Sequence, residues 1–108
     1  MKLVSRIEEI ILLAIWRLQD DAYGITILEE VEKTTGKTWL TGSIYASLGR
    51  LLKRKLVNSV EGEPSPERGG RRKIYYRLTA EGQKALLEIK RLNTRAWIDL
   101  PSFDIEKK

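Results

Sequence analysis

The sequence predicts a mainly helical fold with one small β-hairpin, in the order three helices, hairpin, final helix. Three observations lead to this prediction. Apolar residues recur at helical spacing through residues 7–52 and again through 80–100. Between these parts, residues 56–60 and 74–78 are rich in β-branched and aromatic side chains, as strands are. The segment that joins the two runs contains prolines and glycines, which are typical of a loop.

Length and composition narrow the class of protein. One domain is the expectation for 108 residues. Cysteine and histidine are both absent, so disulfides, thiol catalysis and the commonest general base and metal ligand are excluded. We therefore expect no enzyme, no metal and no cofactor. The start of the chain lacks a signal-peptide layout, and the longest apolar run, 10–16, is too short to span a bilayer, which predicts a cytoplasmic protein.

The first helix is expected over residues 7–18, where apolar side chains surround much of its circumference. In a small protein this pattern indicates burial on two sides, against the core and against another subunit. Turn-forming residues 19–21 end it. A second helix is expected to begin at Tyr23-Gly24 and to end at Gly36, with an acidic outer face.

The third helix is expected to have Thr41 or Ser43 as its N-cap. The residues assigned to its outer side are Ser43, Ala46, Ser47, Arg50, Lys53 and Arg54. Small residues near a helix N-terminus allow a close approach to base edges, and cations further along can reach phosphates. Taken by itself, this pattern favours the alternative, an ordinary amphipathic helix whose polar face is solvated.

The hairpin carries a cationic tip. Four of the six residues in 68–73 are charged, so this segment cannot be buried, and its two glycines permit a close approach to another surface. In the strand that follows, alternation places Ile74, Tyr76 and Leu78 on the core side. We interpret the tip as a device that reaches a nucleic-acid backbone or minor groove. The alternative is a solvated turn that prevents edge-to-edge aggregation.

Thr79 is expected to cap a final helix whose apolar stripe lies beyond the compact unit. That stripe needs a partner, which we expect to be the same helix of a second copy together with the first helix. The order of elements is that of a winged helix-turn-helix. The predicted organisation is a winged helix-turn-helix DNA-binding domain over 1–79, a dimerisation helix over 80–100 and a flexible tail over 101–108.

Positive charge is concentrated in one part of the chain. The net charge is +5, yet residues 41–77 alone contain nine cations and three acids. Such a local field attracts polyanions, and double-stranded DNA is the predicted partner. RNA is disfavoured because a helix cannot enter the deep major groove of an A-form duplex. The main alternative is a protein-interaction module whose basic face docks an acidic partner.

Two blocks of sequence resemble the PadR family of bacterial transcriptional regulators. The first is GSIYASLGRL at 42–51, followed by Leu56-Val57, and the second is GGRRKIYYRLT at 69–79, followed by Gly82. The pair Tyr23-Gly24 is a weaker third match. The resemblance implies a dimer that binds a palindromic operator, commonly as a repressor released by a small aromatic or lipophilic effector. The length is similar to that of the subfamily with a single C-terminal helix. Lys55 is a departure, since many members have glycine there.

The residues predicted to contact DNA are Ser43, Tyr45, Ala46, Ser47, Arg50, Lys53, Arg68, Arg71, Arg72 and Lys73. The cations of the tip suit phosphate or minor-groove contacts. Tyr45 has two interpretations, a phosphate ligand through its hydroxyl or a packed tyrosine with an exposed end. Trp16 and Trp97 are candidates to hold a flat effector across a two-fold axis, and the alternative is plain interface packing.

Overall fold

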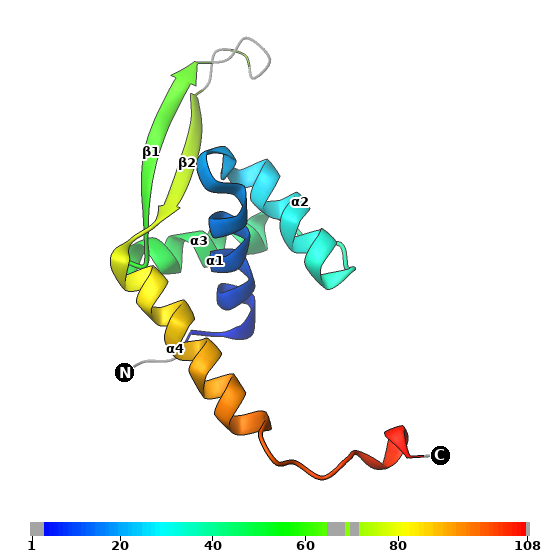
Figure 1. Ribbon diagram of the computed structural model, residues 1–108. Coiled ribbons are helices and arrows are strands. Elements are labelled where there is room, and N and C mark those ends of the chain that lie inside the picture. Colours follow the sequence, from blue (N-terminus) through cyan, green and yellow to red (C-terminus); the bar gives the residue numbers. More distant parts are fainter. Residues whose placement is uncertain (1–3, 65–68, 70–71, 108) are drawn as a thin grey trace.

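A computed structural model describes residues 4–64, 69 and 72–107 of the chain. Its main elements are α1 (Arg6–Leu18), α2 (Gly24–Thr35), α3 (Thr41–Lys53), β1 (Val57–Pro64), β2 (Arg72–Leu78) and α4 (Ala80–Trp97), with short 3-10 turns at Gln19–Asp21 and Asp104–Glu106. The hairpin rises from the three-helix bundle, and α4 leaves the foot of the hairpin in another direction (Figure 1). This order confirms the predicted winged helix-turn-helix.

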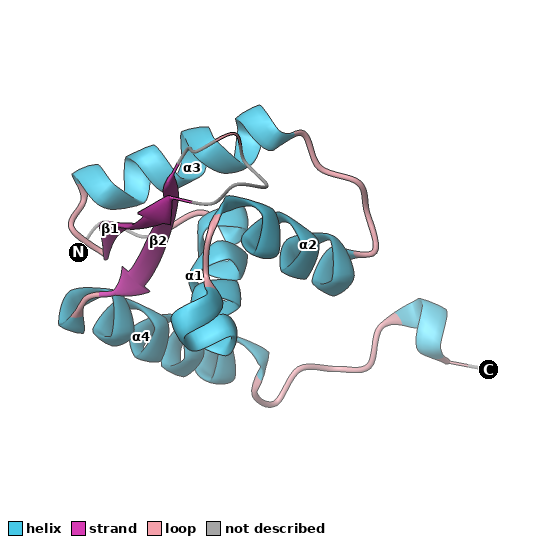
Figure 2. Ribbon diagram, turned by 90° about the horizontal axis from the view of Figure 1, so that it is seen from above, coloured by secondary structure: helices cyan, strands magenta, loops and turns pink. Residues whose placement is uncertain are grey.

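Helix α1 is the central element of the molecule. It contacts α2, α3, β2 and α4. Seen from above, α3 and α4 lie on opposite sides of α1 (Figure 2). The fully buried side chains that form the core are Ile11, Leu12 and Ile15 of α1, Ile27 and Val31 of α2, Ile44, Leu48 and Leu51 of α3, and Val57 of β1. This central position explains the buried apolar residues of the first helix, whereas Leu13 and Trp16 on the same helix stay exposed.

The hairpin rests on the core through its base. The strands are antiparallel, with Val57 opposite Leu78 and Ser59 opposite Tyr76. Tyr76 is buried and Leu78 is half-buried, as alternation predicts. The prediction is wrong for Ile74, which is 37% exposed, because at this level the opposite face of the strand, with Lys73 and Tyr75, packs against Tyr23.

The two ends of α3 differ from expectation in instructive ways. The N-cap is Leu40 rather than Thr41 or Ser43, and the Leu40 carbonyl accepts hydrogen bonds from the amides of Ser43 at 3.0 Å and Ile44 at 3.3 Å. Thr41 is already helical. The helix therefore begins by backbone geometry, since Leu40 is extended, and leaves the Ser43 side chain exposed on its first turn.

The C-terminal end of α3 is a Schellman turn built around Lys55. Lys55 has a φ of 62°, the left-handed conformation that glycine favours. Its amide donates to the Leu52 carbonyl at 3.0 Å, and the Leu56 amide donates to the Leu51 carbonyl at 3.0 Å. The turn thus keeps a glycine-like geometry although a lysine occupies the position.

The start of α4 is locked to this turn. The Thr79 hydroxyl accepts a hydrogen bond from the Gly82 amide at 3.0 Å, which confirms the predicted cap, and donates one to the Lys55 carbonyl at 2.8 Å. A Cβ atom on Gly82 would lie 2.1 Å from the Leu56 carbonyl oxygen. Glycine is therefore required where α4 crosses the junction between α3 and β1. Within the described part of the chain, no helix has the length and apolarity needed to cross a membrane.

Candidate nucleic-acid interface

The outer face of α3 presents small residues first and a cation later. Ser43, Ala46 and Lys53 are exposed and recur at intervals of three and seven residues along one side of the helix. Because serine and alanine side chains add little bulk, a helix of this kind can lie close to another surface. This arrangement suits a helix that enters a groove.

Ser47 does not belong to that face, and its placement on the outer side was wrong. The residue is only 3% exposed, and its hydroxyl accepts a hydrogen bond from Nη2 of Arg50 at 2.9 Å. The reason is helical geometry, because Ser47 lies one turn from both Ile44 and Leu51 on the buried side. Ser47 supports the Arg50 side chain from within the protein instead of facing a base.

Arg50 is held from a second direction by a residue that sequence reasoning missed. The carboxylate of Glu8 on α1 is 3.6 Å from Nε of Arg50 and, through its other oxygen, 3.6 Å from Nη1 of Arg54. Glu8 also accepts a hydrogen bond from the Ser5 amide at 2.8 Å. The motif Ser5-x-x-Glu8 is a capping box and was a usable signal for the helix start, although it does not predict the arginine contacts.

The charge state of Glu8 reflects these neighbours. Burial of the carboxyl raises its pKa, but the hydrogen bonds from Ser5 and the positive charges of Arg54 and Arg50 outweigh burial. The net effect lowers the pKa of Glu8 below its usual value. Glu8 is therefore a stable anion beneath the C-terminal half of α3.

Tyr45 ties α3 to the start of α2. A Cβ atom on Gly24 would lie 2.0 Å from the Tyr45 hydroxyl oxygen, so this tyrosine packs across the helix start while 44% of the residue stays exposed. Burial raises the pKa of Tyr76, and the nearby Tyr45 phenol raises it further. Packing of Tyr45 thus explains why glycine follows Tyr23, and it brings together two of the positions that carried the family resemblance.

The hairpin is fixed to the helices by aromatic contacts. The rings of Tyr23 and Tyr75 meet edge to face with centroids 5.5 Å apart, and Nζ of Lys73 lies 4.4 Å from the centre of the Tyr23 ring. Arg77 forms an ion pair with Asp20. Lys73 is therefore half-buried against α2, so its position is set by the protein itself.

Arg72 is the predicted tip cation that the structure describes as exposed. Its Nη1 is 3.6 Å from a Glu61 carboxylate oxygen on the facing strand, and both side chains are largely accessible to solvent. An exposed pair of this kind is weak and can exchange for a phosphate. Arg68 and Arg71 lie outside the described residues.

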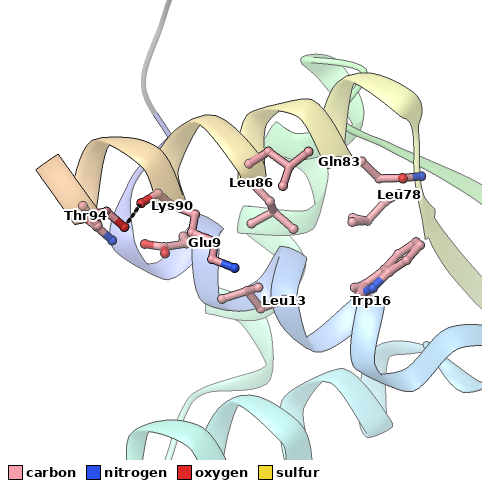
Figure 3. Close-up of a pocket in the computed structure, with 10 residues that line it drawn as sticks. Glu9, Leu13, Trp16, Leu78, Gln83, Leu86, Lys90 and Thr94 are labelled. Carbon is pink, nitrogen blue, oxygen red and sulfur yellow. Dashed lines mark hydrogen bonds between the residues drawn. The ribbon is translucent and has the colours of Figure 1, made fainter.

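A groove of about 590 Å³ separates α1 from α4. Its lining includes Leu13 and Trp16 of α1, Leu86 and Lys90 of α4, and Leu78 (Figure 3). Trp97 lies away from this groove and packs edge-on against Phe103, with ring centroids 6.2 Å apart. Within one chain the two tryptophans are thus not brought together, and their meeting across a two-fold axis stays a prediction.

The fold and the exposed helix face define a winged helix-turn-helix of the DNA-binding type. Comparison with protein families matches residues 11–88 to the transcriptional regulator PadR-like family. The chain belongs to this family of transcriptional regulators, whose members are not enzymes. A search of curated proteins gives no match.

Solved structures agree with this assignment. A PadR family transcription regulator from Clostridium difficile R20291 shares 28% identity over 84% of this chain and 88% of that chain, with a TM-score of 0.64. A PadR-like regulator from Bacillus cereus strain ATCC 14579 shares 28% identity over 83% of this chain and 82% of that chain, with a TM-score of 0.69. RosR of H. salinarum shares the fold, at 21% identity over 91% and 81% of the two chains and a TM-score of 0.69.

Proposed function

We propose that the protein is a cytoplasmic homodimeric repressor that binds a palindromic operator in double-stranded DNA. In this proposal α3 enters the major groove and the hairpin contacts the backbone or minor groove. The observation that carries it is the exposed face of Ser43, Ala46 and Lys53, small at the helix start and cationic at its end. The exposed Arg72 on the hairpin supplies a phosphate contact beside that helix.

The proposal of a dimer rests on the apolar surface around α4. Leu87 is 51% exposed and Leu92 is 42% exposed, and across the groove Leu13 and Trp16 of α1 are exposed as well. Exposed apolar side chains on both sides of a groove are typical of a protein contact. We propose that α4 of a second copy covers this surface. The dimer then presents two copies of α3 to the two halves of an operator.

We propose that the groove beside Trp16 also binds a small effector. An indole and several leucines form an apolar surface for a flat ring, while Glu9 and Lys90 offer polar groups at another part of the lining (Figure 3). In this proposal a lipophilic or aromatic compound bound between α1 and α4 shifts the two DNA-binding units and releases the operator. Titration of a candidate compound into the operator complex, with anisotropy as the readout, tests this step.

The test of DNA binding is fluorescence anisotropy with the protein's own upstream DNA and with scrambled DNA, across a salt series. Tight, salt-dependent binding that prefers the native fragment is the expected result. Binding that is absent even at low salt would overturn the proposal and favour the acidic protein partner.

Two variants distinguish a direct phosphate contact of Arg72 from an effect of the overall positive charge. Arg72→Ala is expected to weaken binding to every sequence and to reduce the salt slope by about one unit. Lys107→Ala in the tail removes the same charge far along the chain and serves as the matched control. An unchanged slope for Arg72→Ala would show that this arginine is not on a phosphate.

A further inference from the structure

The Glu8 carboxylate is the buried charge at the centre of a contact between α1 and α3. The residue is 6% exposed and reaches Arg50 with one oxygen and Arg54 with the other. Capping of α1 by itself does not require this burial, since a Glu at that position reaches the N-cap amide from the surface of a helix. Buried ion pairs are also poor stabilisers compared with apolar packing, because the charges must leave water. Stability by itself therefore does not account for the buried carboxylate.

The arrangement determines the orientation of the Arg50 guanidinium. Glu8 lies at Nε, and the buried Ser47 hydroxyl accepts a hydrogen bond from Nη2. These two contacts come from different helices and fix the plane of a group that has five donors in a rigid fork. The Arg50 side chain is still 56% exposed, so the remaining donors face solvent next to Lys53 and Ala46.

We propose that Glu8 is a positioning residue for DNA binding, which acts by holding Arg50 in the orientation that contacts a phosphate. The inference rests on the proposed function, because it uses α3 as the helix that meets DNA. A held arginine loses less side-chain freedom on binding than a free one, and this raises affinity. Glu8 itself touches no DNA in this arrangement.

For Glu8→Gln the proposal predicts a change in DNA affinity opposite in direction to the change that simple electrostatics predicts. Removing a negative charge from a protein that binds a polyanion should tighten binding if Glu8 acts only through its charge. If Glu8 acts by positioning Arg50, Glu8→Gln should weaken operator binding by about five- to tenfold and lower the salt slope by up to about one unit. A loss of folded protein would reduce the active fraction without changing the slope.

Glu30 on α2 provides the matched control. Its side chain is 12% exposed, and its carboxylate pairs with Arg17 of α1 at 3.2 Å, outside both the proposed DNA-binding face and the effector groove. Glu30→Gln removes the same charge and is expected to leave affinity unchanged or slightly higher. Thermal melts of both variants establish that each is folded under the binding conditions.

A double-mutant cycle tests whether the effect passes through Arg50. Arg50→Ala is expected to weaken binding, and Glu8→Gln is expected to have no further effect in that background. Ser47→Ala removes the other contact to Arg50 and should also weaken binding, which keeps the test available if Glu8→Gln does not fold. Equal or tighter binding of folded Glu8→Gln overturns the inference.

The outcomes distinguish this inference from the proposed function. If Arg50→Ala binds normally while Arg72→Ala is weakened, the positioning role is overturned and the DNA-binding proposal stands. If the unmodified protein does not bind DNA even at low salt, both fail. A normal Arg50→Ala together with a weakened Glu8→Gln also overturns the inference, because the effect would then bypass Arg50.

Discussion

Two regions of the molecule differ in how they bury their apolar side chains. One region is the three-helix unit together with the hairpin, and the other is helix α4. The first contains the fully buried core, with Ile11, Leu12 and Ile15 of α1 at its centre. In α4, whose residues are all described, the one buried residue is Gly82. Leu86 and Ile89 are half-buried, while Leu87 and Leu92 are exposed. The three-helix unit therefore buries its apolar side chains within one chain, whereas α4 keeps apolar side chains that a single chain leaves exposed.

The position of α4 is set at its first turn, through the Thr79 cap and the close approach of Gly82 to Leu56. Beyond this turn, its contact with α1 leaves the open groove that Trp16 and Lys90 line (Figure 3). A helix can thus be placed accurately by its start while most of its apolar surface stays available for another molecule.

The largest expected effect is on the core. Leu12→Ala should lower the free energy of unfolding by about 3 kcal/mol, because it opens a cavity among fully buried side chains. Leu92→Ala should change it by less than about 0.5 kcal/mol at protein concentrations low enough for a monomer. Urea unfolding at several concentrations measures both. A large loss of unfolding free energy for Leu92→Ala that does not depend on protein concentration would contradict the comparison. A loss that grows with protein concentration would show that Leu92 is buried only when two copies associate.

Gly82→Ala should cost about 2 kcal/mol, since its Cβ would meet a backbone oxygen that can move only with the junction. Gly49→Ala is the control. A Cβ atom at Gly49 meets no atom of the described residues within 4 Å, and alanine there should stabilise α3 by about 0.5 to 1 kcal/mol. Thermal unfolding of the two variants tests the claim, and similar melting temperatures would show that α4 is not anchored through Gly82.

The Glu8 carboxylate should make stability depend on pH. Its pKa is lowered in the folded protein, so its ionised form stabilises the fold above about pH 5, and this contribution is lost as the pH falls through the lowered pKa. The groups facing it are Ser5, the N-cap of α1, together with Arg50 of α3 and Arg54, the C-cap of α3. Glu8→Gln should be about 1.5 kcal/mol less stable at neutral pH, with a difference that shrinks in acid. A difference independent of pH would argue against this origin.

The smallest effect concerns the turn at Lys55 between α3 and β1, which the start of α4 contacts through Thr79. Lys55→Gly should raise the free energy of unfolding by about 0.5 to 1 kcal/mol, because the φ of 62° strains a side chain and suits glycine. Lys53→Gly removes the same side chain within α3 and should be destabilising by a similar amount. Chemical denaturation of the pair decides the matter, and a destabilised Lys55→Gly would show that the lysine side chain contributes packing there.

Much of the fold follows from local sequence. The helix boundaries at Gly36 and Thr79 were predicted from capping chemistry and are observed. The cap of α3 was missed because an extended Leu40 is recognisable only from the backbone. At Ser47 the prediction failed although the signal was present, since the residue shares the buried side of α3 with Ile44 and Leu51.

Some features of the candidate site also follow from local sequence, and others follow only from the tertiary structure. The sequence by itself determined which elements carry the cations and that α3 begins with exposed small residues, Ser43 and Ala46, because both depend on residues close together in the chain. Tertiary structure alone decided that Glu8 holds Arg50 and that the Tyr45 hydroxyl covers Gly24. These contacts join residues more than twenty positions apart, and no local preference encodes them. They arise when buried groups from different helices must satisfy one another's charge and shape inside a single core.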